Sequence, residues 1–116
     1  RDSFFPPYSI CWWDTLNQKG TAVLERRIDM EKYAIEKMLQ YENVRLFSFF
    51  NKYDLICNLD NYVDDIHYTG DVNNLILQWM KSGEYELTKE NYEDYIAKER
   101  AFYTSYDYDQ LFGEQQ

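Results

Sequence analysis

Cysteine, proline and glycine are all scarce in this sequence of 116 residues, which has two cysteines, two prolines and four glycines. So little glycine and proline excludes collagen-like and low-complexity chains, and a content of 45% hydrophobic and 19% aromatic residues excludes a disordered one. Cys11 and Cys57 lack the paired spacing of a zinc or redox motif, and whether they form a disulfide stays open. The length and composition predict a single globular domain over residues 1–116.

Basic residues are also few, since 12 lysines and arginines stand against 21 aspartates and glutamates, for a net charge of -9. Phosphate backbones and anionic membrane surfaces are bound by clustered lysine and arginine, so we expect neither partner for this segment. No apolar run approaches the roughly 20 residues of a membrane helix. A glycine-rich phosphate loop is missing too, which disfavours nucleotide binding.

The first third of the chain predicts a strand, a helix and a second strand. Residues 3–9 resemble a short strand that ends at Pro6 and Pro7, followed by a loop through Trp12 and Trp13. From Thr21 to about residue 41 the apolar side chains recur on one helical face. Residues 44–50 are rich in β-branched and aromatic types, as in a buried strand. This order is typical of a βαβ unit with two parallel strands.

Two further helices are expected after a polar stretch over residues 51–65. One has cap candidates at residues 69–71, an apolar face from Val72 to Met80, and a stop at Gly83. The other begins at Thr88 as its N-cap. The tail, residues 106–116, shows no periodicity and is expected to lie on the surface or fray. The predicted fold class is therefore α/β, with a short parallel sheet and an extra C-terminal helix.

The candidate chemistry centres on His67, the only histidine in the chain. A lone loop histidine is more often structural than catalytic, but Asp64 precedes this one by three residues, just before a helix start. A carboxylate at that spacing can hold one imidazole nitrogen while the other faces a nucleophile, as in a Ser-His-Asp triad. Asp65 and Asp60 remain alternatives for the working acid. Loops of this kind lie at the carboxyl ends of parallel strands, where sites gather.

The order of these features resembles the last third of SGNH (GDSL-like) hydrolases. The resemblance covers roughly residues 4–80, and its specific part is the run Asp-Asn-Tyr-Val-Asp-Asp-Ile-His-Tyr over residues 60–68. The nearest likeness is to cell-envelope members that transfer or remove acyl groups on glycans. It implies a flavodoxin-like α/β/α sandwich in which His67 is the general base and Asp64 orients it, with no cofactor and no metal. It also implies an extracytoplasmic or cell-envelope location and an acylated polysaccharide or another ester as substrate.

The departures from that family are as informative as the likeness. The Gly-Asp-Ser block, the oxyanion glycine and the asparagine block have no counterpart, and the serines present lack a glycine-rich strand-to-helix setting: Ser3, Ser9, Ser48, Ser82 and Ser105. Together with the start at Arg1 rather than Met, this predicts a C-terminal fragment of a larger domain, inactive alone. Its partners would be the rest of that domain or, through an open sheet edge, a second copy.

A non-catalytic module that binds glycan or protein through the acidic, tyrosine-rich surface is the competing class. Trp12 and Trp13 suit sugar stacking, although aromatic pairs like this one more often pack into or against the core. The loop of residues 58–61 lacks the glycine and terminal glutamate of an EF-hand, so calcium binding is disfavoured. Glycosidase chemistry between paired acids is disfavoured further, because it needs a fixed separation that no motif here supplies.

Overall fold

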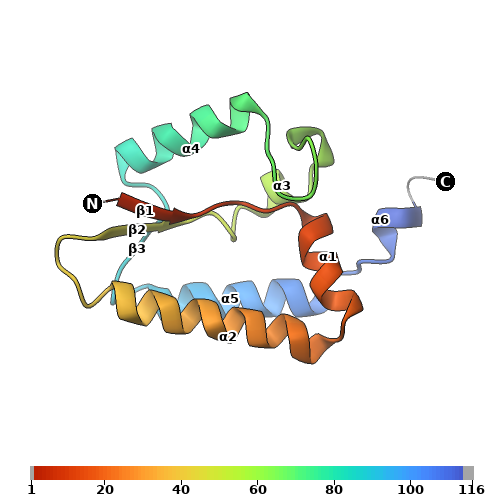
Figure 1. The fold of residues 1–116 in the computed structure, drawn as a ribbon, viewed down its shortest axis with the longest axis horizontal. Coiled ribbons are helices and arrows are strands. Elements are labelled where there is room, and N and C mark those ends of the chain that lie inside the picture. The colour runs from red at the N-terminus through yellow and green to blue at the C-terminus, as the bar shows by residue number, and fades with distance from the viewer. Residues whose placement is uncertain (1, 114–116) are drawn as a thin grey trace.

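The computed structural model describes residues 2–113. Helices and strands alternate along the chain, and Figure 1 shows the strands in the middle with helices on both sides. The elements, in chain order, are β1 (Asp2–Phe5), α1 (Ile10–Gln18), α2 (Thr21–Met38), β2 (Arg45–Ser48), α3 (Tyr53–Ile56), the short 3-10 helix η1 (Leu59–Asn61), α4 (Gly70–Ser82), β3 (Glu86–Leu87), α5 (Tyr92–Ser105) and α6 (Gln110–Gly113).

The sheet has three strands in the order β1-β2-β3. Strands β1 and β2 are parallel, with Asp2 opposite Arg45 and Phe5 opposite Ser48, which confirms the parallel pair predicted from the strand-helix-strand order. Strand β3 pairs with β2 in the antiparallel sense, so the sheet is mixed rather than purely parallel. Strand β1 forms one edge, and none of the residues in the described range pairs with its outer side.

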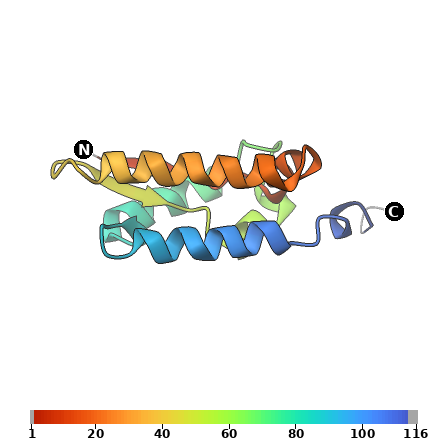
Figure 2. The ribbon, with the colours of Figure 1, turned by 90° about the horizontal axis from the view of Figure 1, so that it is seen from below.

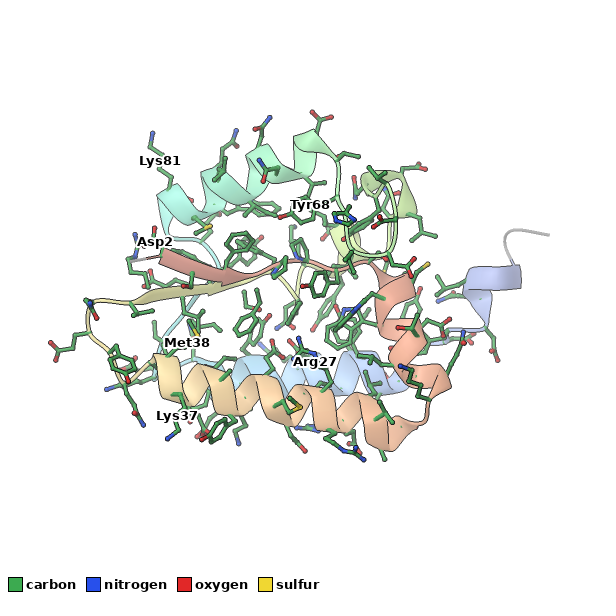
Figure 3. The ribbon with its side chains drawn as sticks, viewed as in Figure 1. Asp2, Arg27, Lys37, Met38, Tyr68 and Lys81 are labelled. Carbon is green, nitrogen blue, oxygen red and sulfur yellow. The ribbon has the colours of Figure 1, made fainter. Side chains whose placement is uncertain are left out.

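Helices cover both faces of this sheet. Because side chains alternate along a strand, Phe47 and Phe49 face α4, where the Phe49 ring lies 5.7 Å from that of Trp79, while Ser48 faces α5 and contacts Tyr95. Helices α2 and α5 lie together against this second face (Figure 1). Figure 3 shows Lys81 on α4 and Lys37 on α2 pointing away from the sheet on opposite sides of the molecule. The polar faces of the helices are therefore outward, as their sequence pattern predicts.

The two long predicted helices are present with nearly the expected bounds. Helix α2 begins at Thr21 and buries Leu24, Ile28 and Ile35, the apolar positions of its periodic pattern. Helix α4 ends at Gly83, whose φ of 82° is left-handed and costs a glycine little. Helix α5 starts at Tyr92 rather than directly after Thr88, because Thr88 and Asn91 bond reciprocally through backbone nitrogen and side-chain oxygen.

Two regions differ from the sequence-based expectation. The segment through Trp12 and Trp13 is helix α1, not a loop, and Trp13 is buried against the stacked ring of Tyr103 at 3.9 Å. Part of the tail packs against the core rather than lying on the surface. Tyr108 and Leu111 are both buried, and the Tyr108 hydroxyl donates to the Tyr103 carbonyl. Residues 114–116 of the predicted tail lie outside the described range.

The architecture is thus a mixed α/β fold built around a small sheet, which confirms the predicted class at that level. The thiols of Cys11 and Cys57 are both free and half-buried. Across residues 2–113, no helix combines the length and the apolar character needed to traverse a lipid bilayer.

Candidate functional site

The segment before helix α4 folds into a tight hairpin-like turn over residues 62–68. Tyr62 and Tyr68 form an antiparallel bridge, and the Val63 nitrogen donates to the His67 carbonyl at 2.8 Å. The Thr69 nitrogen closes the base of the turn by donating to the Asn61 carbonyl at 2.9 Å. We refer to residues 62–68 as the histidine turn.

The histidine turn is tied to the segment that leaves the carboxyl end of β1. The Ser9 nitrogen donates to the Asp65 carbonyl at 3.0 Å, and the Tyr62 hydroxyl donates to the Pro7 carbonyl at 2.6 Å. Since β1 and β2 are parallel, their carboxyl ends share one edge of the sheet. The histidine turn therefore lies at the edge where open α/β sheets carry their binding and catalytic groups.

Within the turn, the structure brings Asp64 and His67 together. The His67 Nδ1 atom lies 2.7 Å from Asp64 Oδ2 and 2.9 Å from Oδ1. Asp64 Oδ1 also accepts hydrogen bonds from the backbone nitrogens of Ile66, at 3.0 Å, and of His67, at 2.8 Å. This Asx-type turn is the local reason for the geometry, because the carboxylate that shapes the backbone also receives the imidazole.

These contacts favour an ionised Asp64. The backbone hydrogen bond from Ile66, the His67 side chain and the His67 backbone nitrogen together lower the pKa of the Asp64 carboxyl below its ordinary value. An ionised carboxylate only accepts hydrogen bonds, so Nδ1 of His67 must donate to it. In the neutral imidazole this leaves Nε2 without a proton, which is the state a general base requires.

A groove of about 380 Å³ runs beside His67, lined by Pro6, Tyr8, Ile66 and Tyr68. Neither the Tyr8 nor the Tyr68 hydroxyl forms a hydrogen bond within the described residues, so both are available to a ligand. Burial, and then the neighbouring Tyr8, raise the pKa of the Tyr68 hydroxyl, so it stays protonated. Tyr8 and Pro6 were not predicted as site residues. The signal that points to them is their position at the end of a parallel strand.

The alternative acids do not reach the imidazole. Asp65 uses its backbone carbonyl to hold Ser9, and no described contact joins its carboxylate to His67. Asp60 lies in η1, where its nitrogen donates to the Asn58 side chain at 3.1 Å. Asp64 is therefore the acid that the geometry pairs with His67.

No nucleophile accompanies this pair among residues 2–113. Ser9 lies nearest along the tied segment, but its hydroxyl is buried and without a hydrogen-bond partner. Burial, followed by Asp65 and Asp14, raises the pKa of the Cys11 thiol, so this residue is not an activated thiolate. The pair has the parts of an acid-base device and lacks the group on which it would act.

Trp12 and Trp13, the residues considered for sugar stacking, both take part in packing within the protein. Trp13 is a core residue, and Trp12 is half-buried between Tyr8, at 4.7 Å between rings, and the Arg27 guanidinium, at 5.5 Å. In the part of the chain that the structure describes, no three histidine, cysteine, aspartate or glutamate side chains converge as metal ligands would.

Comparison with known proteins adds no relative. The sequence matches no protein-family model, and neither the curated proteins nor the solved structures yield a match. The geometry of the histidine turn is therefore the basis for a proposed function.

Replacing Asp64 by asparagine is expected to change the tautomer of His67. Without the carboxylate, the neutral ring loses its preference for a proton on Nδ1 and takes up the Nε2-protonated form that predominates in free histidine. Imidazole ¹⁵N chemical shifts measure this directly. Asp65→Asn is the matched control and should leave the shifts unchanged, whereas an Nε2-protonated ring in the unsubstituted protein would contradict the hydrogen-bond assignment.

Proposed function

We propose that this chain is the C-terminal part of an SGNH-like serine hydrolase or O-acyltransferase domain that acts on ester-linked acyl groups of envelope glycans. The single observation that carries the proposal is the Asp64–His67 pair at the carboxyl edge of the parallel strands, with Nε2 free beside a groove. The helices on both faces of the sheet are what a flavodoxin-like three-layer sandwich would have, and we include that fold in the proposal. From the resemblance of residues 4–80 to cell-envelope SGNH hydrolases, we also propose that the activity lies outside the cytoplasm.

His67 would act as the base in this scheme. Its Nε2 takes the proton from a serine hydroxyl as that oxygen attacks the ester carbonyl, and the resulting imidazolium returns the proton to the departing sugar oxygen. Water or an acceptor hydroxyl then attacks the acyl-serine and loses its proton to the same nitrogen, and the imidazolium returns that proton to the serine oxygen as its bond to the acyl group breaks. Asp64 keeps its negative charge throughout and stabilises the imidazolium from Nδ1. No metal or cofactor enters these steps.

The serine would come from the remainder of the domain. The outer side of β1 carries no strand in the described structure, and the segment that follows β1 lines the His67 groove through Pro6 and Tyr8. A strand added beside β1 in the parallel sense would end next to that groove, where a nucleophile is needed. Pairing with a second copy at the same edge is the competing use of this strand.

A non-catalytic module that binds glycan or protein is the second candidate. It is favoured by the missing nucleophile and by the pair of free tyrosine hydroxyls in the groove. Such hydroxyls can bind a sugar without any chemistry.

A serine-directed fluorophosphonate probe separates the two. The full-length protein, with whatever sequence precedes residue 1, should be labelled on a serine that follows a strand, and the coding sequence upstream should show that strand and a Gly-Asp-Ser block. Absence of both the block and the label, together with glycan binding by this chain alone, would reject the enzyme in favour of the module.

A further inference from the structure

Two glutamates lie fully buried where helices α2 and α5 meet. Glu31 of α2 is 1% exposed and Glu99 of α5 is 0% exposed. Figure 2 shows the two helices side by side and running in opposite directions, so that the middle of each faces the other. Glutamate is almost never buried to this extent without a charged partner. We refer to Glu31 and Glu99 as the carboxyl pair.

The carboxyl pair has no conventional donor. All four oxygen atoms are buried, and no described group donates to them in good hydrogen-bond geometry. The two carboxyl groups are neighbours across the interface of the two helices, since each acts on the pKa of the other. Since an ionised carboxylate cannot donate, this contact is favourable when one of the two is protonated and repulsive when both are charged.

The surroundings do not neutralise two charges. Arg27, on the same helix as Glu31, is the cation that acts on both members, and its guanidinium also lies over the Trp12 ring. The other polar groups that face the pair are neutral hydroxyls, contributed by α5 and α3: Tyr95, Tyr103 and Tyr53. One cation and one shared proton therefore balance the site at neutral pH.

Burial of the two carboxyl groups also favours the retention of a proton at neutral pH. Removal from water raises the pKa of Glu31 to about 7, although Glu99 and Arg27 oppose the change. Burial and then the neighbouring Glu31 raise the pKa of Glu99 well above its ordinary value of 4.5. Glu99 is accordingly the member that keeps the proton and donates it to Glu31.

We propose that a proton shared between Glu31 and Glu99 holds helix α5 against α2, so that its loss at alkaline pH loosens α5 from the rest of the molecule. The other polar contacts of this interface lie near its surface. They are Arg100 with Asp29 at 2.5 Å, Arg100 with Glu25 at 3.7 Å and Tyr92 with Glu36 at 2.8 Å. Exposed pairs of this kind contribute little, so the buried centre decides the pH response.

A movement of α5 would also disturb its hydrogen bonds to the sheet and to the segment that follows β2. Tyr95 of α5 is hydrogen-bonded to Ser48 at the carboxyl end of β2, and the Tyr103 hydroxyl donates to the Phe50 carbonyl at 2.5 Å. Both contacts hold the segment from which the chain runs on to the histidine turn. The carboxyl pair thus links ambient pH to the carboxyl edge of the sheet, independently of the catalytic proposal.

Urea denaturation between pH 4.5 and pH 8.5 tests the proposal. An unfolded glutamate loses its proton near pH 4.5, whereas the folded pair retains protons to about pH 7 or above. Over that interval the folded state binds more protons than the unfolded state, so the free energy of unfolding falls as the pH rises. The unfolding constant of the wild type should increase about 100-fold relative to Glu99→Gln, in which the amide gives Glu31 a permanent donor.

Glu90→Gln is the matched control, because it removes the same charge from an exposed site, and its curve should parallel that of the wild type. Carboxyl ¹³C shifts of the wild type provide a readout that needs no variant, and should show two glutamates that stay protonated at pH 6, of which Glu99 retains its proton longer. If the wild-type and Glu99→Gln curves run parallel, or if every glutamate titrates below pH 5, the shared proton is overturned.

Discussion

Under the proposed function, replacing His67 by alanine in the complete hydrolase domain is expected to lower esterase activity by about 1,000-fold or more in kcat/KM. The substitution removes the proposed base and leaves the serine hydroxyl without an acceptor for its proton. Since the His67 side chain is 69% exposed, its loss should leave stability nearly unchanged. Hydrolysis of p-nitrophenyl acetate and of an O-acetylated glycan would measure the loss, with circular dichroism to confirm the fold.

Two neighbouring substitutions make this result specific. Asp64→Asn should reduce kcat strongly while leaving KM nearly unchanged, because the imidazole loses its carboxylate partner, whereas the amide oxygen can still accept the backbone hydrogen bonds that shape the groove. Asp65→Ala should retain much of the activity, since its carboxylate is not joined to His67. Equal rates for the wild type and His67→Ala would end the catalytic assignment.

Replacing Trp13 by alanine is expected to cost about 3–5 kcal/mol of unfolding free energy, the usual range for removing a large aromatic from a core. Trp13 is 1% exposed, stacks on Tyr103 at 3.9 Å and meets the edge of Phe50 at 5.3 Å. It therefore joins α1 to α5 and to the segment after β2. Urea denaturation followed by circular dichroism would measure the change.

Trp12→Ala is the matched control, because the adjacent indole is half-buried and its removal should cost clearly less. If Trp13→Ala does not fold, Trp13→Phe should fold with a smaller loss, since it keeps an aromatic ring in the stack. Equal costs at positions 12 and 13 would show that the stack with Tyr103 contributes little.

Periodicity in the sequence predicts the elements whose apolar residues repeat over several turns. Helix α2 and helix α4 are of this kind, and the stop of α4 at Gly83 follows from glycine alone. Helix α1 is not, because Ile10, Trp12 and Trp13 follow a Pro-Pro pair in a run with little polar alternation. Its helical state depends on burial of Trp13, which is a tertiary contact.

Short elements escape prediction for a related reason. Strand β3 has only two residues, and it forms because Leu87 pairs with Leu46 and Glu86 pairs with Phe47 on β2. The tail is held by the Tyr108 hydroxyl and by burial of Leu111, neither of which leaves a periodic pattern. Cross-strand register and side-chain docking decide both cases.

The candidate site divides in the same way. The spacing of Asp64 and His67 is local, so the sequence predicts their contact, and the structure adds the backbone hydrogen bonds that fix it. Tyr8 lies nearly sixty positions away and joins the groove through the parallel pairing of β1 and β2. The carboxyl pair is missed because two helices of ordinary charged composition must pack before either glutamate is buried.

The hydrogen bond between the Ser9 nitrogen and the Asp65 carbonyl has a consequence for timing. It joins the histidine turn, which carries His67, directly to the segment that emerges from β1. In the proposed complete domain, a strand that pairs with β1 would fix the position of this segment and, through the hydrogen bond, the position of the imidazole at the same time. Until such a strand is added, Asp64 and His67 are already paired but have no nucleophile beside them.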